Sequence, residues 1–347
     1  MSEKIVKVGI VGTGFGGFTH IPAFNMCPNA QVIAICGRDK DKTDSLAKKY
    51  NIKKTYYDYE SMLGLDELDL ISIALPPFLQ YEHVDLAIDA DKHVLCEKPF
   101  TLNSVETEKL IKKINKTDLV GAVGYQMRFQ PARQTIKNIL LGGDLGKIIN
   151  INMSYNYSSR LQDNIIWDWW SEKNMGGGVL NAMGSHQIDL LQWWFGDIID
   201  SSGDLITLNK ALFDDKTKID KQVTSDELVI GKFELQNNLY ASIVISSVAI
   251  GWKTSNIEIY GTNGALFLDG EEKLSMIRKT TAKHDLTKKE ELLSIPWVSG
   301  SIWRAAFYRQ IDELVDSIIN DSNYCGALFE DGLKTRKVID QFLMEKS

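Results

Sequence analysis

The chain has 347 residues, a length that predicts two domains. Hydrophobic residues make up 44% of it and charged residues 24%, which is typical of a globular protein with a sizeable core. The formal net charge of −7 at pH 7 argues against nucleic acid or an anionic membrane surface as the main partner.

The first third of the chain alternates strand-like and helix-like segments. The segments 39–50 and 81–91 have helical periodicity. Strands are predicted at 7–12, 31–37, 68–77, 92–99 and 119–126. Strands with nearly continuous apolar content, separated by helices, indicate a parallel sheet covered on both faces. The predicted fold is a doubly wound α/β Rossmann domain, which binds ligands at the carboxyl ends of its strands.

After about residue 145, longer strands with turns between them are expected. These strands are predicted at 148–157, 227–235, 239–248, 256–261 and 265–270. The turn signals at 237–238 and 262–264 predict hairpins, and two helices follow at 304–319 and 330–345. The pattern predicts an α+β domain with a large open, mostly antiparallel sheet. The expected domains are therefore 1–122 and 123–347.

The cysteines and the N-terminus predict a reducing, cytoplasmic environment. The four cysteines are scattered without a CxxC motif or metal-ligand spacing, so no bound metal is expected. Cys36 and Cys96 lie in apolar runs typical of buried, reduced thiols. The first residues lead directly into a strand with no secretory h-region, and no apolar run is long enough to span a bilayer.

A glycine-rich motif, GTGFGG, directly follows the first predicted strand. In the pattern GxGxxG, Gly12 permits a tight turn, Gly14 lets the backbone approach a pyrophosphate, and Gly17 lets helix and strand pack closely. The helix that follows offers N–H groups to phosphates. In this context the motif predicts dinucleotide binding. The expected contacts are Gly12, Thr13, Gly14, Phe15, Gly16 and Gly17.

The end of the second predicted strand indicates which dinucleotide is bound. A carboxylate that holds the ribose 2′-hydroxyl is expected after Cys36, where the chain has Gly37 and then Arg38. A guanidinium can bind a 2′-phosphate through charge-assisted hydrogen bonds, so NADP(H) is the preferred cofactor. The alternative is that Arg38 faces solvent and Asp39 contacts the ribose, so that NAD(H) is bound.

The fourth predicted strand ends in CEKP, at the sheet edge where the nicotinamide is expected. Lys98 could donate or accept a proton, or orient a substrate oxygen, if a desolvated site lowers its pKa. The alternative is a surface lysine at a strand end. Pro99 fixes the backbone directly after it.

Six stretches along the chain carry a recognisable pattern. They are GIVGTGFGG (9–17), IALPP (73–77), CEKP (96–99), VGYQMRFQPA (123–132), GGGVLNAMGSHQIDLLQWWFG (176–196) and YGTNGALFLDG (260–270). In this order they resemble the glucose–fructose oxidoreductase / inositol dehydrogenase / rhizopine-catabolism (Gfo/Idh/MocA) family of oxidoreductases. The resemblance implies hydride transfer between a nicotinamide cofactor and a sugar, sugar derivative, cyclitol or related polyol. It also implies a C-terminal domain whose open sheet commonly mediates homodimers or homotetramers.

The resemblance implies roles for individual residues. Lys98 would hydrogen-bond the reacting oxygen and the nicotinamide ribose, and His186 would be the acid or base. Leu75, Pro76 and Glu97 join Lys98 among the expected cofactor contacts. The glycines at 176–178 predict a close approach of substrate or cofactor to the backbone.

Two positions depart from the family pattern. Members often have an aspartate one helical turn before the histidine, where this chain has Ala182. Asp189, three residues after His186, could orient the imidazole instead, or could make a helix or interdomain hydrogen bond. Gln80 stands where the family often has a histidine.

Polar and aromatic side chains are expected to flank the substrate. Arg128 and Asp189 can bind hydroxyl groups, and Trp167, in the aromatic run 167–170, offers a ring to the C–H faces of a sugar. Core packing is the alternative for these tryptophans. The acidic pair 226–227 is a weaker candidate.

Three functions fit the sequence. The first is an NAD(P)-dependent dehydrogenase or reductase acting on CH–OH groups of a sugar or polyol, which the intact Lys98 and His186 favour. The second is a non-catalytic dinucleotide-binding sensor that regulates a partner protein, which Ala182 favours. The third is NAD-assisted glycoside cleavage through transient oxidation, for which no residue specifically argues.

Overall fold

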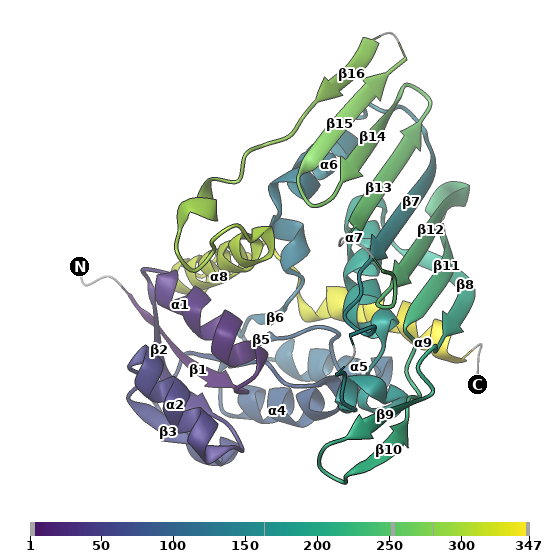
Figure 1. Ribbon diagram of the computed structural model, residues 1–347. Helices are drawn as coiled ribbons and strands as arrows, with labels where there is room; N and C mark the ends of the chain where they lie inside the picture. Colours follow the sequence, from purple (N-terminus) through teal and green to yellow (C-terminus); the bar gives the residue numbers. More distant parts are fainter. Residues whose placement is uncertain (1–3, 163, 251–253, 280, 345–347) are drawn as a thin grey trace. The chain divides into compact units, whose positions relative to one another are not determined.

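Figure 1 shows the computed structural model, whose contacts divide it into two compact units. The residues that it describes are 4–162, 164–250, 254–279 and 281–344. Unit 1 comprises Met1–Phe129 and Leu292–Leu333, and unit 2 comprises Gln130–Glu291 and Lys334–Ser347. The first unit boundary lies close to the expected one after residue 122. The segment Leu292–Leu333, in contrast, was assigned to the second domain from the sequence and packs within unit 1.

The described part of unit 1 contains a parallel sheet of six strands in the order β3-β2-β1-β4-β5-β6. The strands are β1 (Val6–Val11), β2 (Ala30–Cys36), β3 (Lys54–Tyr56), β4 (Leu70–Ile73), β5 (His93–Cys96) and β6 (Gly121–Val123). The winding reverses between β1 and β4, and α/β sheets bind ligands beyond the carboxyl ends of the strands at such a switch point. The predicted Rossmann fold is therefore confirmed.

Helices connect these strands, and side chains cap several of them. The helices of unit 1 are α1 (Ile21–Met26), α2 (Lys40–Tyr50), α3 (Tyr59–Leu63), α4 (Pro77–Asp89), α5 (Ser104–Ile114) and α8 (Ile302–Asn320). Asp39, Asp58 and Asn103 each accept a hydrogen bond from the backbone N–H three residues later, which explains why α2, α3 and α5 begin there.

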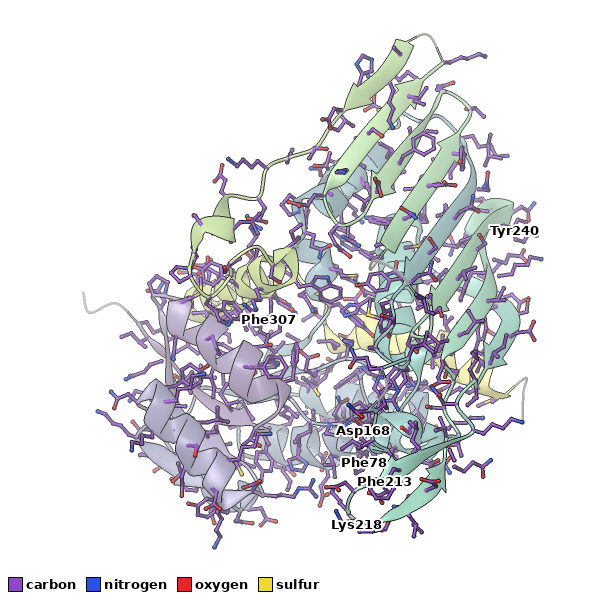
Figure 2. All side chains as sticks on the ribbon, in the orientation of Figure 1. Phe78, Asp168, Phe213, Lys218, Tyr240 and Phe307 are labelled. Carbon is purple, nitrogen blue, oxygen red and sulfur yellow. The ribbon has the colours of Figure 1, made fainter. Side chains whose placement is uncertain are left out.

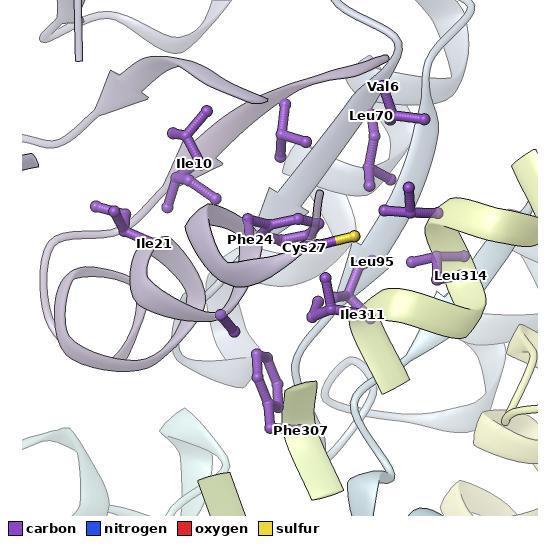
Figure 3. Close-up of a cluster of buried hydrophobic side chains, with 14 of the residues drawn as sticks. Val6, Ile10, Ile21, Phe24, Cys27, Leu70, Leu95, Phe307, Ile311 and Leu314 are labelled. Atoms are coloured by element: carbon purple, nitrogen blue, oxygen red, sulfur yellow. The ribbon is translucent and has the colours of Figure 1, made fainter. Parts of the chain in front are cut away.

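Helix α8 belongs to unit 1 because its apolar side chains complete the core on one face of the parallel sheet. Figure 3 shows Ile311 and Leu314 of α8 in one buried cluster with Phe24 of α1 and Ile10 of β1. All four side chains are fully buried. Burying one such side chain contributes about 1.5–3 kcal/mol, so these contacts stabilise the packing of α8 within unit 1.

The described part of unit 2 contains a sheet of eight strands in the order β16-β15-β14-β13-β7-β12-β11-β8. The strands are β7 (Ile148–Asn156), β8 (Ile198–Ile206), β11 (Leu228–Leu235), β12 (Leu239–Ser246), β13 (Thr254–Gly261), β14 (Gly264–Asp269), β15 (Lys273–Arg278) and β16 (Thr281–Asp285). Neighbouring strands are antiparallel except β7 and β12. The predicted mostly antiparallel sheet is confirmed, as are the hairpins at 237–238 and 262–264.

One face of this sheet is buried and the other is open. In β12, Ile243 and Ile245 are buried, whereas Tyr240 and Val244 are exposed. The remaining elements of unit 2 are α6 (Pro131–Leu141), α7 (Ser185–Phe195), the hairpin β9 (Ala211–Asp214) and β10 (Ile219–Gln222), and α9 (Phe329–Met344) from Lys334 onward. Among the described residues, no helix has the length and apolar character that a membrane span requires.

Candidate active site

The glycine-rich loop after β1 leaves open space where a dinucleotide is expected. Gly12 has a φ of 104°, and a Cβ there would collide with the carbonyl oxygen of Ala74, so only glycine fits. Gly14 is exposed, and no atom of the described residues lies within 4 Å of a Cβ built on it. A tight turn beside an open glycine is the cradle that a pyrophosphate requires. The loop therefore fits the cofactor that the sequence predicts.

The next two glycines pack against the protein itself. The loop continues into a π-helical turn, Gly16–His20. A Cβ on Gly16 would lie 3.2 Å from Ile10 Cγ2, and one on Gly17 would lie 2.7 Å from Leu46 Cδ1. Gly16 thus faces strand β1, whereas Gly17, for which the sequence predicted strand packing, faces helix α2.

The end of β2 has no room for the carboxylate that binds a ribose. A Cβ on Gly37 would collide with Thr13 and would lie 2.7 Å from Thr43 Oγ1. Arg38 follows and is exposed. The carboxylate of Asp39 accepts a hydrogen bond of 3.0 Å from the backbone N–H of Lys42 at the start of α2. Asp39, the alternative ligand for the ribose, therefore caps helix α2.

Lys98 lies directly beyond β5, after a buried Glu97 and before a cis peptide bond to Pro99. Burial lowers the pKa of Lys98 from its ordinary value, while the negative charge of Glu97 acts in the opposite direction. A lowered pKa increases the fraction of a lysine that is present as the neutral amine, the form that can accept a proton. Lys98 therefore lies at the predicted strand end, in surroundings that lower its pKa.

A buried histidine that the sequence analysis missed contacts Glu97. His20 is fully buried at the end of the π-helical turn, with Nδ1 2.7 Å from Ser72 Oγ and Nε2 3.1 Å from Glu97 Oε1. One carboxylate oxygen of Glu97, an expected cofactor contact, is thus engaged inside the protein. The signal was present in the sequence, since this histidine ends the glycine-rich stretch at 20.

Two further groups of expected contacts lie in unit 1. Leu75 and Pro76 are half-buried between β4 and α4, and Leu75 Cδ2 lies 3.4 Å from a Cβ built on Gly12. Leu75 therefore adjoins the glycine loop, as a cofactor contact requires. Arg128 is buried, and its Nη2 lies 3.0 Å from Asp331 Oδ1, so its charge is already balanced within unit 1.

In unit 2, the glycines before His186 make room for the protein rather than for a ligand. A Cβ on Gly177 would collide with the carbonyl of Trp170. Gly178 has a φ of 101°, and a Cβ there would collide with the carboxylate of Asp226. For Gly177 and Gly178 the expectation of a close approach by substrate or cofactor is therefore corrected, because other segments of unit 2 fill the space.

Asp226 holds the segment that leads to His186. A second π-helical turn, Leu180–Gly184, precedes α7, and Asp226 Oδ2 accepts a hydrogen bond of 2.7 Å from the N–H of Leu180. Burial raises the pKa of Asp226 to about 6, against the opposing effect of the backbone hydrogen bond from Leu180. His186 and Asp189 are both buried on α7, and Ala182 is half-buried in the turn. The sequence had ranked the pair 226–227 only as a weak candidate.

Trp167 contacts the β9–β10 hairpin. Its indole N–H donates a hydrogen bond of 3.1 Å to the carbonyl of Gln222, and the ammonium of Lys221 lies 4.4 Å from its ring centroid. Its backbone N–H donates to the carbonyl of Phe213, which is labelled in Figure 2 together with Asp168, the next residue after Trp167. Trp167 is half-buried, and a cation lies over its ring.

The expected site residues thus fall into two sets. Unit 1 holds Gly12, Thr13, Gly14, Phe15, Gly16, Gly17, Arg38, Leu75, Pro76, Glu97, Lys98 and Arg128. Unit 2 holds Trp167, His186 and Asp189. Within unit 1, the glycine loop and the ends of β4 and β5 meet at one edge of the sheet, because β1, β4 and β5 are neighbours.

These features define a dinucleotide-binding oxidoreductase domain joined to an open-sheet domain, and comparisons specify the family. Residues 6–125 match the model of an oxidoreductase family with an NAD-binding Rossmann fold, and residues 133–267 match the GFO/IDH/MocA C-terminal domain. The chain belongs to the Gfo/Idh/MocA family of oxidoreductases and is an enzyme of that family that uses a nicotinamide dinucleotide.

Individual relatives extend over most of the chain. An uncharacterised oxidoreductase of Synechocystis is 33% identical over 324 residues, which are 90% of this chain and 86% of the relative. Glucose-6-phosphate 3-dehydrogenase of Bacillus subtilis is 23% identical over 98% of this chain and 96% of its own. Myo-inositol 2-dehydrogenase of Thermotoga maritima is 22% identical over 80% of this chain and 77% of its own.

A solved structure supports the fold. Levoglucosan dehydrogenase in complex with NADH and L-sorbose superposes with a TM-score of 0.90 at 19% identity, and the match covers 98% of this chain and 96% of the other. At this identity the likeness establishes a shared architecture.

Proposed function

We propose that the chain transfers hydride between NADP(H) and a carbon that bears a hydroxyl group in a sugar, sugar derivative or cyclitol. The observation that carries this proposal is Lys98, a lysine of lowered pKa at the strand ends beside the open glycine loop. Relatives named for activity on a sugar phosphate and on a cyclitol support the substrate class.

In this reaction, residues of the chain bind the cofactor and transfer the proton. The backbone of the loop 12–17 binds the pyrophosphate, and the bound nicotinamide supplies or accepts the hydride. As a carbon loses hydride, its hydroxyl must lose a proton, and the neutral amine of Lys98 can accept it. In the reverse direction the same amine, once protonated, returns the proton. His186 in unit 2 is the second candidate for proton transfer.

Replacing Lys98 by alanine tests the proposal most directly. Because general acid–base catalysis contributes about 10²–10⁴-fold, we expect Lys98→Ala to lower kcat by about 10³-fold and to leave cofactor affinity within about 3-fold. Steady-state kinetics and fluorescence titration measure the two quantities. Lys116→Ala, at an exposed lysine beyond α5, is the control for loss of one positive charge. Unchanged turnover in Lys98→Ala would contradict the proposal.

The proposed preference for NADP(H) rests on the end of β2. Gly37 leaves no room for a carboxylate, Arg38 is exposed and Asp39 caps α2. Because charge-assisted hydrogen bonds are worth about 1.5–3 kcal/mol, Arg38→Ala should weaken NADPH binding by about 10- to 100-fold. NADH binding should stay within about 2-fold, since that dinucleotide has no 2′-phosphate. Equal losses for both would count against the preference.

A panel of sugars, keto-sugars and cyclitols then tests the substrate class. Oxidation and reduction are assayed with the cofactor that binds more tightly. Turnover of at least one member of the panel is expected. Tight cofactor binding without turnover across the whole panel would instead support the non-catalytic sensor as the function.

We also propose a homodimer or homotetramer that uses the open face of the unit 2 sheet. Tyr240, labelled in Figure 2, is exposed on this face together with Ile230 and Val244. Ile230 and Val244 are paired across β11 and β12, so their side chains form one apolar patch. Light scattering should detect an oligomer for the wild type and a smaller species for Val244→Asp. A monomeric wild type would overturn this proposal.

A further inference from the structure

Gln80 joins three backbone segments of unit 1 through one side chain. It lies in the first turns of α4 and is fully buried. Its Nε2 donates hydrogen bonds of 3.0 Å to the carbonyl oxygens of Leu75 and Glu97. Its Oε1 accepts a hydrogen bond of 2.8 Å from the N–H of Thr101. Both amide donors and the amide acceptor are therefore used on the backbone.

Two of these bonds hold both ends of the loop that carries Lys98. Glu97 immediately precedes Lys98, and Thr101 follows it by three residues. Thr101 has a φ of 61°, a conformation that β-branched residues rarely adopt, so its surroundings must hold it there. The bond from its N–H to Gln80 and the 2.7 Å contact of its Oγ1 with Thr107 Oγ1 do this.

The third bond ties the same amide to the cofactor side of the sheet. Leu75 follows β4, and its side chain adjoins the turn at Gly12. Gln80 therefore fixes the Lys98 loop relative to the segment that borders the glycine loop. A displacement of about 1 Å of a reacting group can cost about 100-fold in rate, so such a connection has a direct consequence for proton transfer.

The chemistry of the amide suits this position better than that of other side chains of similar size. An amide supplies two donors and one acceptor, as the two carbonyl groups and one N–H require. A glutamate would place a carboxylate against two carbonyl oxygens. A neutral imidazole supplies one donor and one acceptor, and both nitrogens become donors when it is protonated. Glutamine satisfies all three partners at every pH at which the protein is folded.

We propose that Gln80 is a positioning residue for Lys98, and that it holds the loop 97–101 with a side chain that does not titrate. This inference rests on the proposed role of Lys98 in proton transfer. The nearby groups that can titrate or carry charge belong to the loop, to its neighbours and to α4. They are Cys96, Glu97, Lys98, His20, Glu106, Tyr81, Glu82 and His83.

Three substitutions at position 80 separate positioning from general stability. Gln80→Met keeps the length and removes all three bonds, so kcat should fall by about 100-fold with KM and cofactor affinity within about 3-fold. In Gln80→Glu, kcat should fall at least as far as in Gln80→Met. Gln80→His should recover part of kcat at alkaline pH and lose it as the imidazole protonates, which adds an acid limb absent from the wild type. Glu82→Met, at an exposed position on the same helix, is the control and should behave as the wild type.

Hydrogen exchange of the cofactor-free protein supplies a readout that does not depend on activity. The amide of Thr101 should exchange about tenfold faster in Gln80→Met, because its acceptor is removed, while the amides of β1 should not change. If Gln80→Met showed the wild-type exchange rate at the Thr101 amide and the wild-type kcat, the inference would be overturned.

The outcomes also distinguish this inference from the proposed function. If Lys98→Ala retains full turnover, the proposed role of Lys98 fails. If Lys98→Ala loses turnover while Gln80→Met and Gln80→Glu keep it, the inference about Gln80 alone fails. Should Gln80→Met not fold, Gln80→His retains one donor and one acceptor and still gives the pH test. A pH profile of Gln80→His identical to that of the wild type would overturn the inference.

Discussion

Each unit contains a glycine-rich segment, then a π-helical turn, then a helix, and each of these regions carries a fully buried histidine. In unit 1 the turn is Gly16–His20, and in unit 2 it is Leu180–Gly184, followed by His186. Such turns often occur at functional sites. The glycines nevertheless serve different purposes. At Gly14 the space is open, whereas the backbone at Gly178 is in contact with Asp226.

The comparison shows that one sequence signal can have two physical causes. A glycine is required wherever something approaches the backbone closely, and the approaching group can be a ligand or the protein. In unit 1 the space at Gly14 is open, so a ligand can approach the backbone there. In unit 2 the carboxylate of Asp226 approaches the backbone at Gly178 and also accepts a hydrogen bond from the N–H of Leu180. Three sets of substitutions test this comparison.

A matched pair of glycine substitutions should give the largest contrast. Gly178→Ala places a methyl group against Asp226 in a left-handed backbone conformation, which should lower the free energy of unfolding by about 3 kcal/mol. Gly14→Ala meets no atom of the described residues, so stability should stay within about 0.5 kcal/mol while dinucleotide affinity falls. Chemical denaturation and cofactor titration measure both. Equal destabilisation by the two substitutions would remove the distinction.

Asp226 should make the stability of the wild type depend on pH. Its pKa is about 6 in the folded protein, above the ordinary 3.8, so its favourable contribution is complete below about pH 4 and is lost as the pH rises to about 6. A pKa difference of about two corresponds to about 3 kcal/mol of unfolding free energy. The difference in stability between wild type and Asp226→Asn should therefore change by up to that amount between pH 4 and 7. A constant difference would contradict this assignment.

The smallest effect is expected at His186. If it transfers a proton, His186→Ala should lower kcat by about 100-fold and remove one limb of the pH–rate profile. Ala182→Asp adds a carboxylate one helical turn before it, which favours the charged imidazole and should move that limb to higher pH. If His186→Ala leaves both the rate and the profile intact, the histidine has no catalytic role and Lys98 transfers the proton without it.

Much of the fold could be predicted from local patterns. Strands buried on both faces, such as β1 and β4, are mostly apolar and were found from that property. Strand β3 was missed because it is a short edge strand whose residues are only half-buried. Strand β8 was missed because most of its side chains are exposed or half-buried, so that no alternation of apolar residues marks it.

In the candidate site, too, some residues were predicted from local sequence patterns and others were not. The glycine loop and Lys98 were identified because a turn or a strand end has a local sequence signature. His20, Gln80 and Asp226 were not assigned their contacts, because His20 meets Glu97 77 positions away, Gln80 meets Thr101 21 positions away, and Asp226 meets Leu180 46 positions away. Separations of this length have no periodic trace in a sequence.

The sequence by itself determined the alternation of strands and helices in the first domain, the dinucleotide loop and the lysine beyond β5, because each depends on residues close together in the chain. The tertiary structure decided that α8 packs in unit 1, that the glycines before His186 admit Asp226, and that Gln80 holds the Lys98 loop. Those outcomes depend on which buried polar and apolar groups meet after folding. A buried polar group must find its partner wherever the chain brings one.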